Sequence, residues 1–130
     1  MIIAHGIDLV DCPRIEQMLE RHGERFLERV FTEKEQAYAN ANKNRIEKLA
    51  GRFAVKEAVL KLLGTGWRGK IAWTDIEVTR DHAGRPGILL HNVAAATASR
   101  RGITSWLISL SHTEQHAIAS VIGLGPLAVP

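Results

Sequence analysis

Glu57 and Lys61 stand four residues apart in a run of good helix formers, so they share one face of a predicted helix. Their neighbours on that face are small or apolar: Ala50, Phe53, Ala54 and Ala58. A carboxylate in such surroundings is costly unless it is paired or holds a cation. Two interpretations are open from these residues. Either Glu57 bonds Lys61 in a structural pair, which the spacing alone favours, or it holds a cation next to a lysine that contacts phosphate.

Asp8 is a second carboxylate in an unusual position, because it interrupts an apolar run at residues 2–10 that has the composition of a buried strand. Aspartate is disfavoured within strands and expensive to bury. The residue either caps the strand end and faces water, or it is a carboxylate delivered into a site by a rigid element. Both interpretations remain open at this point.

The helix that carries Glu57 is predicted from about residue 49 to residue 63, and Gly64-Thr65-Gly66 ends it. At 100° per residue its apolar side chains almost encircle the axis. A helix of that kind lies in the middle of a fold rather than on its surface. We therefore expect the other elements to pack around it.

Seven further segments carry their own signals. Asp11 and Pro13 open a helix, and Thr32 with Glu35 forms a capping box before a short helix to about residue 41. Alternating segments predict strands at 71–79, 87–90, 105–111 and 116–123, the first two joined as a hairpin, and a helix at 92–101. We expect one α+β domain over residues 1–130, with a small, mainly antiparallel sheet around the long helix.

Bulk composition excludes several classes of protein. The chain has 130 residues, 45% of them hydrophobic, a formal charge of +3 and a pI near 9.4, which suits a globular domain with an anionic partner. Cys12 is the only cysteine, so no internal disulfide forms and the cytoplasm is expected. The first residues do not resemble a signal peptide, and no apolar stretch is long enough for a membrane. With three Trp, one Tyr and three Phe scattered along the chain, we expect no nucleic-acid partner.

Arg14 and Arg21 are seven residues apart on one predicted helix, with Arg25 one turn beyond. Three glutamates balance this basic stripe: Glu16, Glu20 and Glu24. Composition alone favours a solvated face for it.

Several segments, taken in their order and spacing, resemble one family. They are Gly6-Ile7-Asp8-Leu9-Val10, Phe31-Thr32-Glu33-Lys34-Glu35, Gly51 to Ala58 with Lys61 and Gly64-Thr65-Gly66, Asp75 to Val78 with Gly84-Arg85-Pro86, and Ser109-Leu110-Ser111-His112-Thr113. Together they closely resemble the holo-[acyl-carrier-protein] synthases, the small class of 4′-phosphopantetheinyl transferases. The resemblance runs from about residue 2 to residue 123, and Arg-Phe-Ala-x-Lys-Glu-Ala with Lys61 is its most specific part.

The resemblance implies a fold and an activity. The family moves the phosphopantetheine arm of coenzyme A onto a serine of apo acyl carrier protein, with Mg²⁺, releases adenosine 3′,5′-bisphosphate, and supports fatty acid biosynthesis. It usually forms a homotrimer with sites between subunits. The carrier is acidic, which fits the basic pI and the arginine stripe. The alternatives are another nucleotide-dependent transferase, a relative that loads a different carrier, a basic nucleic-acid-binding module, or an inactive scaffold.

Site residues follow from the resemblance position by position. The metal-binding acids match Asp8 and Glu57, and Lys61 matches the lysine that meets the phosphates. The expected coenzyme A contacts are Lys43, Arg52, Lys61, Gly64, Thr65, Gly66, Pro86, His112 and Thr113. Arg14 matches the arginine that meets the carrier, and Arg21 and Arg25 match less closely. One Mg²⁺ ion, which takes one or two carboxylates plus phosphate oxygens, would explain both acids. The group that takes the serine proton stays open between a Mg²⁺-bound water and either carboxylate.

Overall fold

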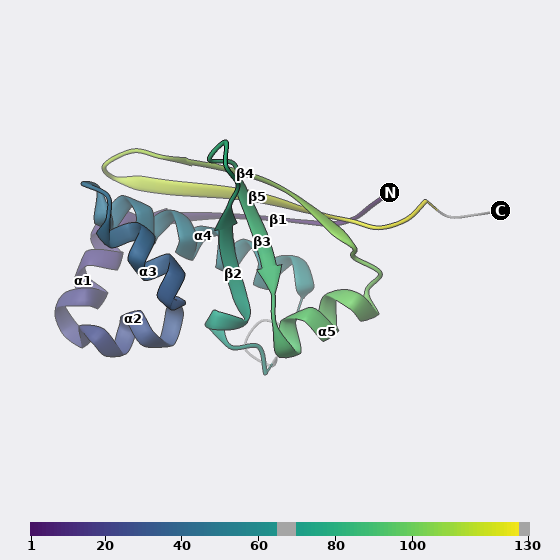
Figure 1. Cartoon of the computed structure of the whole chain (residues 1–130), viewed down its shortest axis with the longest axis horizontal. Helices are drawn as coiled ribbons and strands as arrows, with labels where there is room; N and C mark the ends of the chain where they lie inside the picture. The colour runs from purple at the N-terminus through teal and green to yellow at the C-terminus, as the bar shows by residue number, and fades with distance from the viewer. Residues whose placement is uncertain (65–69, 128–130) are drawn as a thin grey trace.

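The computed structural model describes residues 1–64 and 70–127. A long helix, α4 (Arg45–Leu63), runs along one face of a three-stranded sheet (Figure 1). Twelve of its nineteen residues are buried, which confirms the prediction of a central helix. The helix begins four residues before the predicted start. It ends where predicted, with Gly64 in the left-handed conformation at a φ of 72°.

The three-stranded sheet is antiparallel, with the order β1 (Ile2–Asp11), β5 (His116–Leu124) and β4 (Ser105–His112). Alternate residues of each strand point to α4, as the sequence pattern predicts for β4. The opposite face of the sheet has no covering element among the described residues, and large apolar side chains stand exposed on it.

A second sheet is the hairpin of β2 (Ile76–Arg80) and β3 (Pro86–Leu90), which lies beside α4 (Figure 1). The described residues therefore form two antiparallel sheets, where the sequence predicts one. The strand predicted from residue 71 is shorter, because the 3₁₀ helix η2 (Trp73–Asp75) precedes β2. The buried Asp75 carboxylate fixes this turn by accepting hydrogen bonds from Ala72 N at 3.2 Å and Asn92 Nδ2 at 3.2 Å.

The remaining helices group at the two ends of the molecule (Figure 1). Helices α1 (Cys12–His22), α2 (Glu24–Val30) and α3 (Glu33–Asn40) gather at one end, and α5 (Asn92–Arg100) lies at the other. The predicted capping box of α3 is present: Thr32 N donates to Glu35 Oε1 at 2.8 Å and Glu35 N donates to Thr32 Oγ1 at 3.2 Å. Across the described ranges, no helix is long and apolar enough to cross a membrane.

Candidate active site

Close contact between β1 and α4 brings the two unusual carboxylates together. Gly6 lies so near the helix that a Cβ atom there would come within 2.1 Å of the Ala58 carbonyl oxygen. Only glycine fits at that position, and the small side chains of Ala54 and Ala58 leave room for the strand. Asp8, two residues further along the same face of β1, consequently faces α4 at Glu57.

Lys61 pairs with Asp8 and not with Glu57. Lys61 Nζ lies 2.7 Å from Asp8 Oδ1 and also donates to the Ile7 carbonyl at 3.2 Å. Within residues 1–64 and 70–127 no ion pair of 4 Å or less joins Glu57 to Lys61, so the structural pair favoured by spacing alone is wrong. The second oxygen of Asp8, Oδ2, is buried without a hydrogen-bond partner among the described residues.

Glu57 holds its proton much more tightly than an ordinary glutamate. Burial is the largest cause, followed by a hydrogen bond to Asp8 and by the charge of Asp8, and together they raise the pKa of Glu57 to about 7. The nearby charges of Arg14 and Lys61 oppose the shift only in part. Two carboxylates this close share a proton unless a cation lies between them.

These atoms suit a hard divalent cation. With both carboxylates ionised, the buried Asp8 Oδ2 accepts no hydrogen bond from the described residues. Glu57, which bonds Asp8 only when one of the two holds a proton, supplies a second carboxylate from a different rigid element. In the part of the chain that the structure describes, no cluster of three or more His, Cys, Asp or Glu side chains can hold a metal. A cation here would therefore take only two protein side chains and complete its shell with other oxygen ligands. That is the behaviour of Mg²⁺, which keeps waters and binds substrate phosphates.

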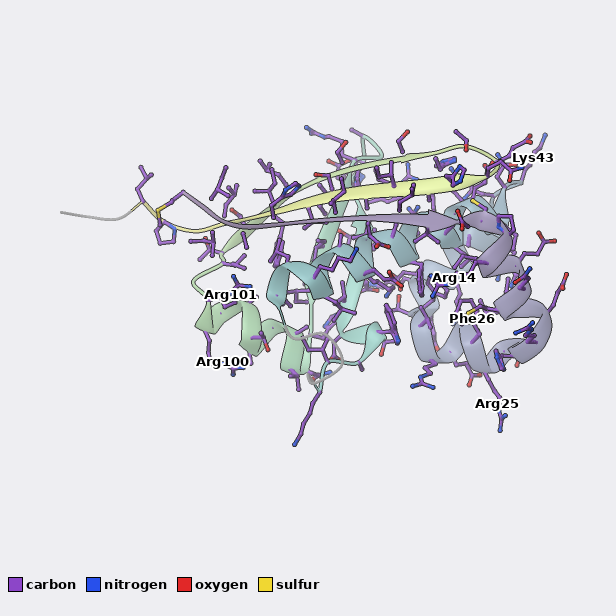
Figure 2. All side chains as sticks on the ribbon, turned by 180° about the vertical axis from the view of Figure 1, so that it is seen from behind. Arg14, Arg25, Phe26, Lys43, Arg100 and Arg101 are labelled. Atoms are coloured by element: carbon purple, nitrogen blue, oxygen red, sulfur yellow. The ribbon has the colours of Figure 1, made fainter. Side chains whose placement is uncertain are left out.

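Arg14 borders this group of charges from α1. Its guanidinium carbon lies 5.8 Å from the centre of the Phe53 ring, and Phe53 stacks on Trp73 at 5.0 Å. Its charge also acts on Glu57. Figure 2 shows Arg14 against the body of the protein, whereas Arg25 projects outward from α2. Arg21 is exposed in the last turn of α1 and Arg25 lies on α2, and of the three predicted carrier contacts only the charge of Arg14 acts on Glu57.

A second group of charges lines a cavity of about 250 Å³ between α3, α4 and β2. Arg52 is 4% exposed, and its guanidinium carbon lies 4.2 Å from the centre of the Tyr38 ring. Arg80 contacts the same ring at 4.6 Å, and Lys34 also lines the cavity. Among the described residues, no carboxylate within 4 Å pairs with any of these three cations.

Sequence reasoning identified Arg52 but missed Lys34, Tyr38 and Arg80. Lys34 and Tyr38 lie four residues apart on α3, which places them on one helix face, whereas Arg80 comes from β2. One signal was available for Arg80, since it is the last residue of β2 and pairs across the hairpin with Pro86, a predicted coenzyme A contact. Pro86 therefore lies beside the rim of this cavity.

The other predicted contacts lie around the turn between β4 and β5 and the ends of α4. His112 Nδ1 is 3.4 Å from Glu47 Oε2, and Thr113 Oγ1 accepts hydrogen bonds from the backbone of the turn. Lys43 is exposed just before α4 (Figure 2). Gly64 caps α4, and Thr65 and Gly66 lie outside the described residues.

The predicted site is not one cluster within a single chain. Arg52 and Glu57 are five residues apart on α4, which turns them about 140° from each other around the helix axis. Arg52 faces the hairpin and Glu57 faces β1. Arg52 and the carboxylate pair thus lie on different sides of the same helix.

Comparison with known proteins gives the class of protein first. A family model described as the 4′-phosphopantetheinyl transferase superfamily matches residues 4–121. That range is most of the chain, so the chain belongs to this superfamily.

Individual relatives narrow the class. A holo-[acyl-carrier-protein] synthase of Koribacter versatilis is 48% identical over 122 residues, which cover 94% of this chain and 98% of the relative. The crystal structure of the Neisseria meningitidis synthase aligns with a TM-score of 0.86 at 30% identity and covers 95% of this chain and 99% of that one. A Bacillus anthracis synthase in complex with CoA (3′,5′-ADP) aligns with a TM-score of 0.78 at 34% identity, covering 97% and 99%. Within the superfamily, this chain is an enzyme of the holo-[acyl-carrier-protein] synthase group.

Proposed function

We propose that this chain transfers the 4′-phosphopantetheine group of coenzyme A to a serine of apo acyl carrier protein, with Mg²⁺, and releases adenosine 3′,5′-bisphosphate. The observation that carries the proposal is the pair of facing carboxylates, Asp8 and Glu57, with Lys61 bound to one of them. The product would serve fatty acid biosynthesis in the cytoplasm.

The carboxylate pair supports the metal assignment. Asp8 Oδ2 and the carboxylate of Glu57 would hold Mg²⁺, which would draw charge from the pyrophosphate of coenzyme A. Lys61 is 59% exposed at its side chain and sits at the mouth of the site, so its ammonium can exchange Asp8 for a phosphate oxygen. The carrier supplies the attacking hydroxyl, and this chain needs no nucleophile. Catalysis then rests on positioning and charge neutralisation, as phosphoryl transfer requires.

The cavity beside the hairpin supports a site for the nucleotide end of coenzyme A. Three cations line this cavity, Arg52, Arg80 and Lys34. Guanidinium groups bind phosphates through bidentate hydrogen bonds. Tyr38 and Pro86 add flat and apolar surface next to these charges. The structures of the Bacillus anthracis and Helicobacter pylori synthases are described as complexes with coenzyme A, which agrees with such a ligand.

Since the carboxylates and this cavity open on different sides of α4, one coenzyme A molecule reaches both only if two subunits contribute. The uncovered face of the three-stranded sheet supports such an assembly. Ile7, Leu9, Leu107 and Ile118 are 51%, 62%, 56% and 40% exposed on it, and apolar side chains gathered in this way mark protein contacts. We infer a homotrimer joined through this face, with a site at each subunit boundary.

Arg14 tests the proposed carrier contact. Arg14→Glu is expected to raise the KM for the carrier protein about tenfold or more, because it places a negative charge where an acidic helix must dock. The KM for coenzyme A should change less than about threefold. Steady-state kinetics with each substrate varied in turn measure both values.

The matched control for Arg14→Glu is Arg100→Glu. Arg100 is exposed on α5, at the opposite end of the molecule (Figure 2). The Arg100→Glu variant changes the net charge of the protein by the same amount as Arg14→Glu, but at a position away from the proposed docking surface. Equal rises in the carrier KM for both variants would mean that only overall charge matters, and the contact would be refuted.

The intact mass of an apo acyl carrier protein tests the function as a whole. The carrier is incubated with this protein, coenzyme A and Mg²⁺, and a second sample contains a chelator. We expect a gain equal to one phosphopantetheine arm in the first sample only. A gain of mass in both samples would refute the proposed Mg²⁺ dependence. No gain with several carrier proteins would refute the assignment of acyl carrier protein as the acceptor.

A further inference from the structure

Lys56 is the lysine of the Lys-Glu pair in the most specific sequence motif, yet its side chain is fully buried. Its ammonium lies 2.8 Å from Glu35 Oε1 and donates to the carbonyls of Trp73 at 3.1 Å and Ile76 at 2.5 Å. An ammonium group has three protons, and these three acceptors use all of them. Lys56 therefore has no proton left for a phosphate.

The Glu35 side chain is as fully buried as that of Lys56, and both of its carboxylate oxygens accept hydrogen bonds. Beyond Lys56, its carboxylate accepts hydrogen bonds from Thr32 N and Val78 N, both at 2.8 Å. Glu35 also lines the cavity that holds Arg52. Arg52 precedes Lys56 by one helical turn, so both cations reach toward the same carboxylate from the same face of α4.

Glu35 is thus an anion that two cations could neutralise, and Lys56 is the one that does. The charge of Glu35 acts on Arg52, although burial dominates and lowers the pKa of Arg52 to about 10. The other acid of the cavity is also engaged, because Glu77 accepts from Thr32 Oγ1 at 3.0 Å and lies 3.1 Å from His91 Nε2. Both carboxylates are thus held by groups other than the cavity cations, and no described carboxylate lies within 4 Å of Arg52, Arg80 or Lys34. These cations are therefore free to bind an anion in the cavity.

We propose that Lys56 is a positioning residue for the nucleotide: by binding Glu35 it keeps the guanidinium of Arg52 available to a phosphate in the cavity. The inference rests on the proposed function, which assigns the nucleotide end of coenzyme A to this cavity. Lys56 touches neither substrate nor metal, and it acts only through Glu35 and Arg52.

Removal of the ammonium has a predictable consequence. In Lys56→Met the buried carboxylate of Glu35 loses its counter-ion, and an unpaired buried charge is strongly unfavourable. Arg52 is the nearest remaining cation on α4 and its planar fork suits a carboxylate. It turns to Glu35, and the cavity loses its buried phosphate-binding group.

The double variant Glu35→Gln/Lys56→Met separates this role from a structural one. It lacks the ammonium as well, and the carbonyls of Trp73 and Ile76 lose the same donor. It also lacks the charge that would capture Arg52. A direct or purely structural role for Lys56 predicts that the double variant binds the nucleotide as poorly as Lys56→Met, whereas our proposal predicts recovery.

The experiment is calorimetric titration of the full-length protein with adenosine 3′,5′-bisphosphate in the presence of a chelator. The chelator removes any contribution from the metal. We expect Lys56→Met to weaken binding about tenfold or more, and the double variant and Glu35→Gln alone to stay within about threefold of the wild type. Melting curves verify that each variant is folded at the titration temperature.

The titrations can contradict the inference in several ways. Weak binding by a folded double variant overturns the inference, as does wild-type affinity in folded Lys56→Met. If Lys56→Met does not fold, the double variant alone decides by whether it binds like the wild type. If the wild-type protein itself does not bind this nucleotide, the nucleotide cavity of the proposed function is wrong and the inference falls with it.

Discussion

Glu57→Gln is expected to lower Mg²⁺-dependent transfer by about 10³-fold or more, because it removes one of the two carboxylates proposed to hold the ion. The substitution keeps the size and shape of the side chain, but it replaces one carboxylate oxygen with an amide NH2 and removes one of the two charges available to a cation. Asp8 alone, already bound to Lys61 through Oδ1, would hold Mg²⁺ poorly. The transfer rate under saturating coenzyme A and carrier measures the loss.

A second readout does not depend on activity. Because the pKa of Glu57 is raised to about 7 in the folded chain from an ordinary value of 4.5, the folded state binds this proton more tightly than the unfolded state. The stabilisation that this proton confers is complete below about pH 4.5 and is lost as the pH rises through 7. In chelator, the melting temperature should therefore fall across this window in the wild type and less so in Glu57→Gln.

Mg²⁺ reverses that dependence, since the ion and the proton compete for the same carboxylate. Added Mg²⁺ should raise the melting temperature of the wild type little at pH 5.5 and fully at pH 8. It should leave Glu57→Gln unchanged at both values. Glu28→Gln, at an exposed position on α2, is the matched control and should behave as the wild type. If Mg²⁺ still raised the melting temperature of Glu57→Gln, the assignment of Glu57 as a metal ligand would be refuted.

Local signals predicted the elements well, because their causes are local. The capping box of α3 needs only Thr32 and Glu35, three residues apart, and both of its bonds are present. The glycine stop of α4 needs only a residue that tolerates a positive φ, and Gly64 supplies it. The β2–β3 hairpin likewise follows from alternation on either side of a turn.

Pairings between distant segments were harder to predict. Spacing favours Glu57 as the partner of Lys61, but the approach of β1 to α4 at Gly6 brings in Asp8, fifty-three positions away in the sequence. Nothing near Lys61 in the sequence encodes that contact. The cavity around Arg52 has the same origin, since its walls come from four elements, α3, α4, β2 and β3.

The resemblance implies metal-binding acids and coenzyme A contacts on the same helix, and helix geometry separates them. Arg52 and Glu57 share a helix yet face apart, and this separation follows from five residues at 100° each. The angle between the two side chains can be calculated from the sequence alone. What each side chain faces is known only from the fold, in which the hairpin lies on one side of α4 and β1 on the other. From this division we infer a site shared between subunits.

Leu9→Asp is expected to dissociate the proposed trimer and to lower transfer about 100-fold or more at low protein concentration. Leu9 is exposed on the uncovered sheet face and lies directly opposite Ile118 on the neighbouring strand. A carboxylate there would have to be buried among apolar side chains of another subunit, which is strongly unfavourable. Sedimentation equilibrium measures the assembly, and Val93→Asp, at an exposed apolar position on α5, is the control that should leave it intact.

Loss of activity in Leu9→Asp would not by itself prove that two subunits build each site, so complementation supplies the stronger result. Glu57→Gln lacks the carboxylate half of the site and Arg52→Gln lacks the nucleotide half, and each variant alone should be nearly inactive. In trimers formed from the two in equal amounts, about one boundary in four joins an intact Glu57 to an intact Arg52 of the next subunit. Co-expressed variants should therefore recover about a quarter of wild-type activity. A mixed preparation that assembles into trimers and stays inactive would mean that each chain holds its own complete site, and the division of α4 into two half-sites would be wrong.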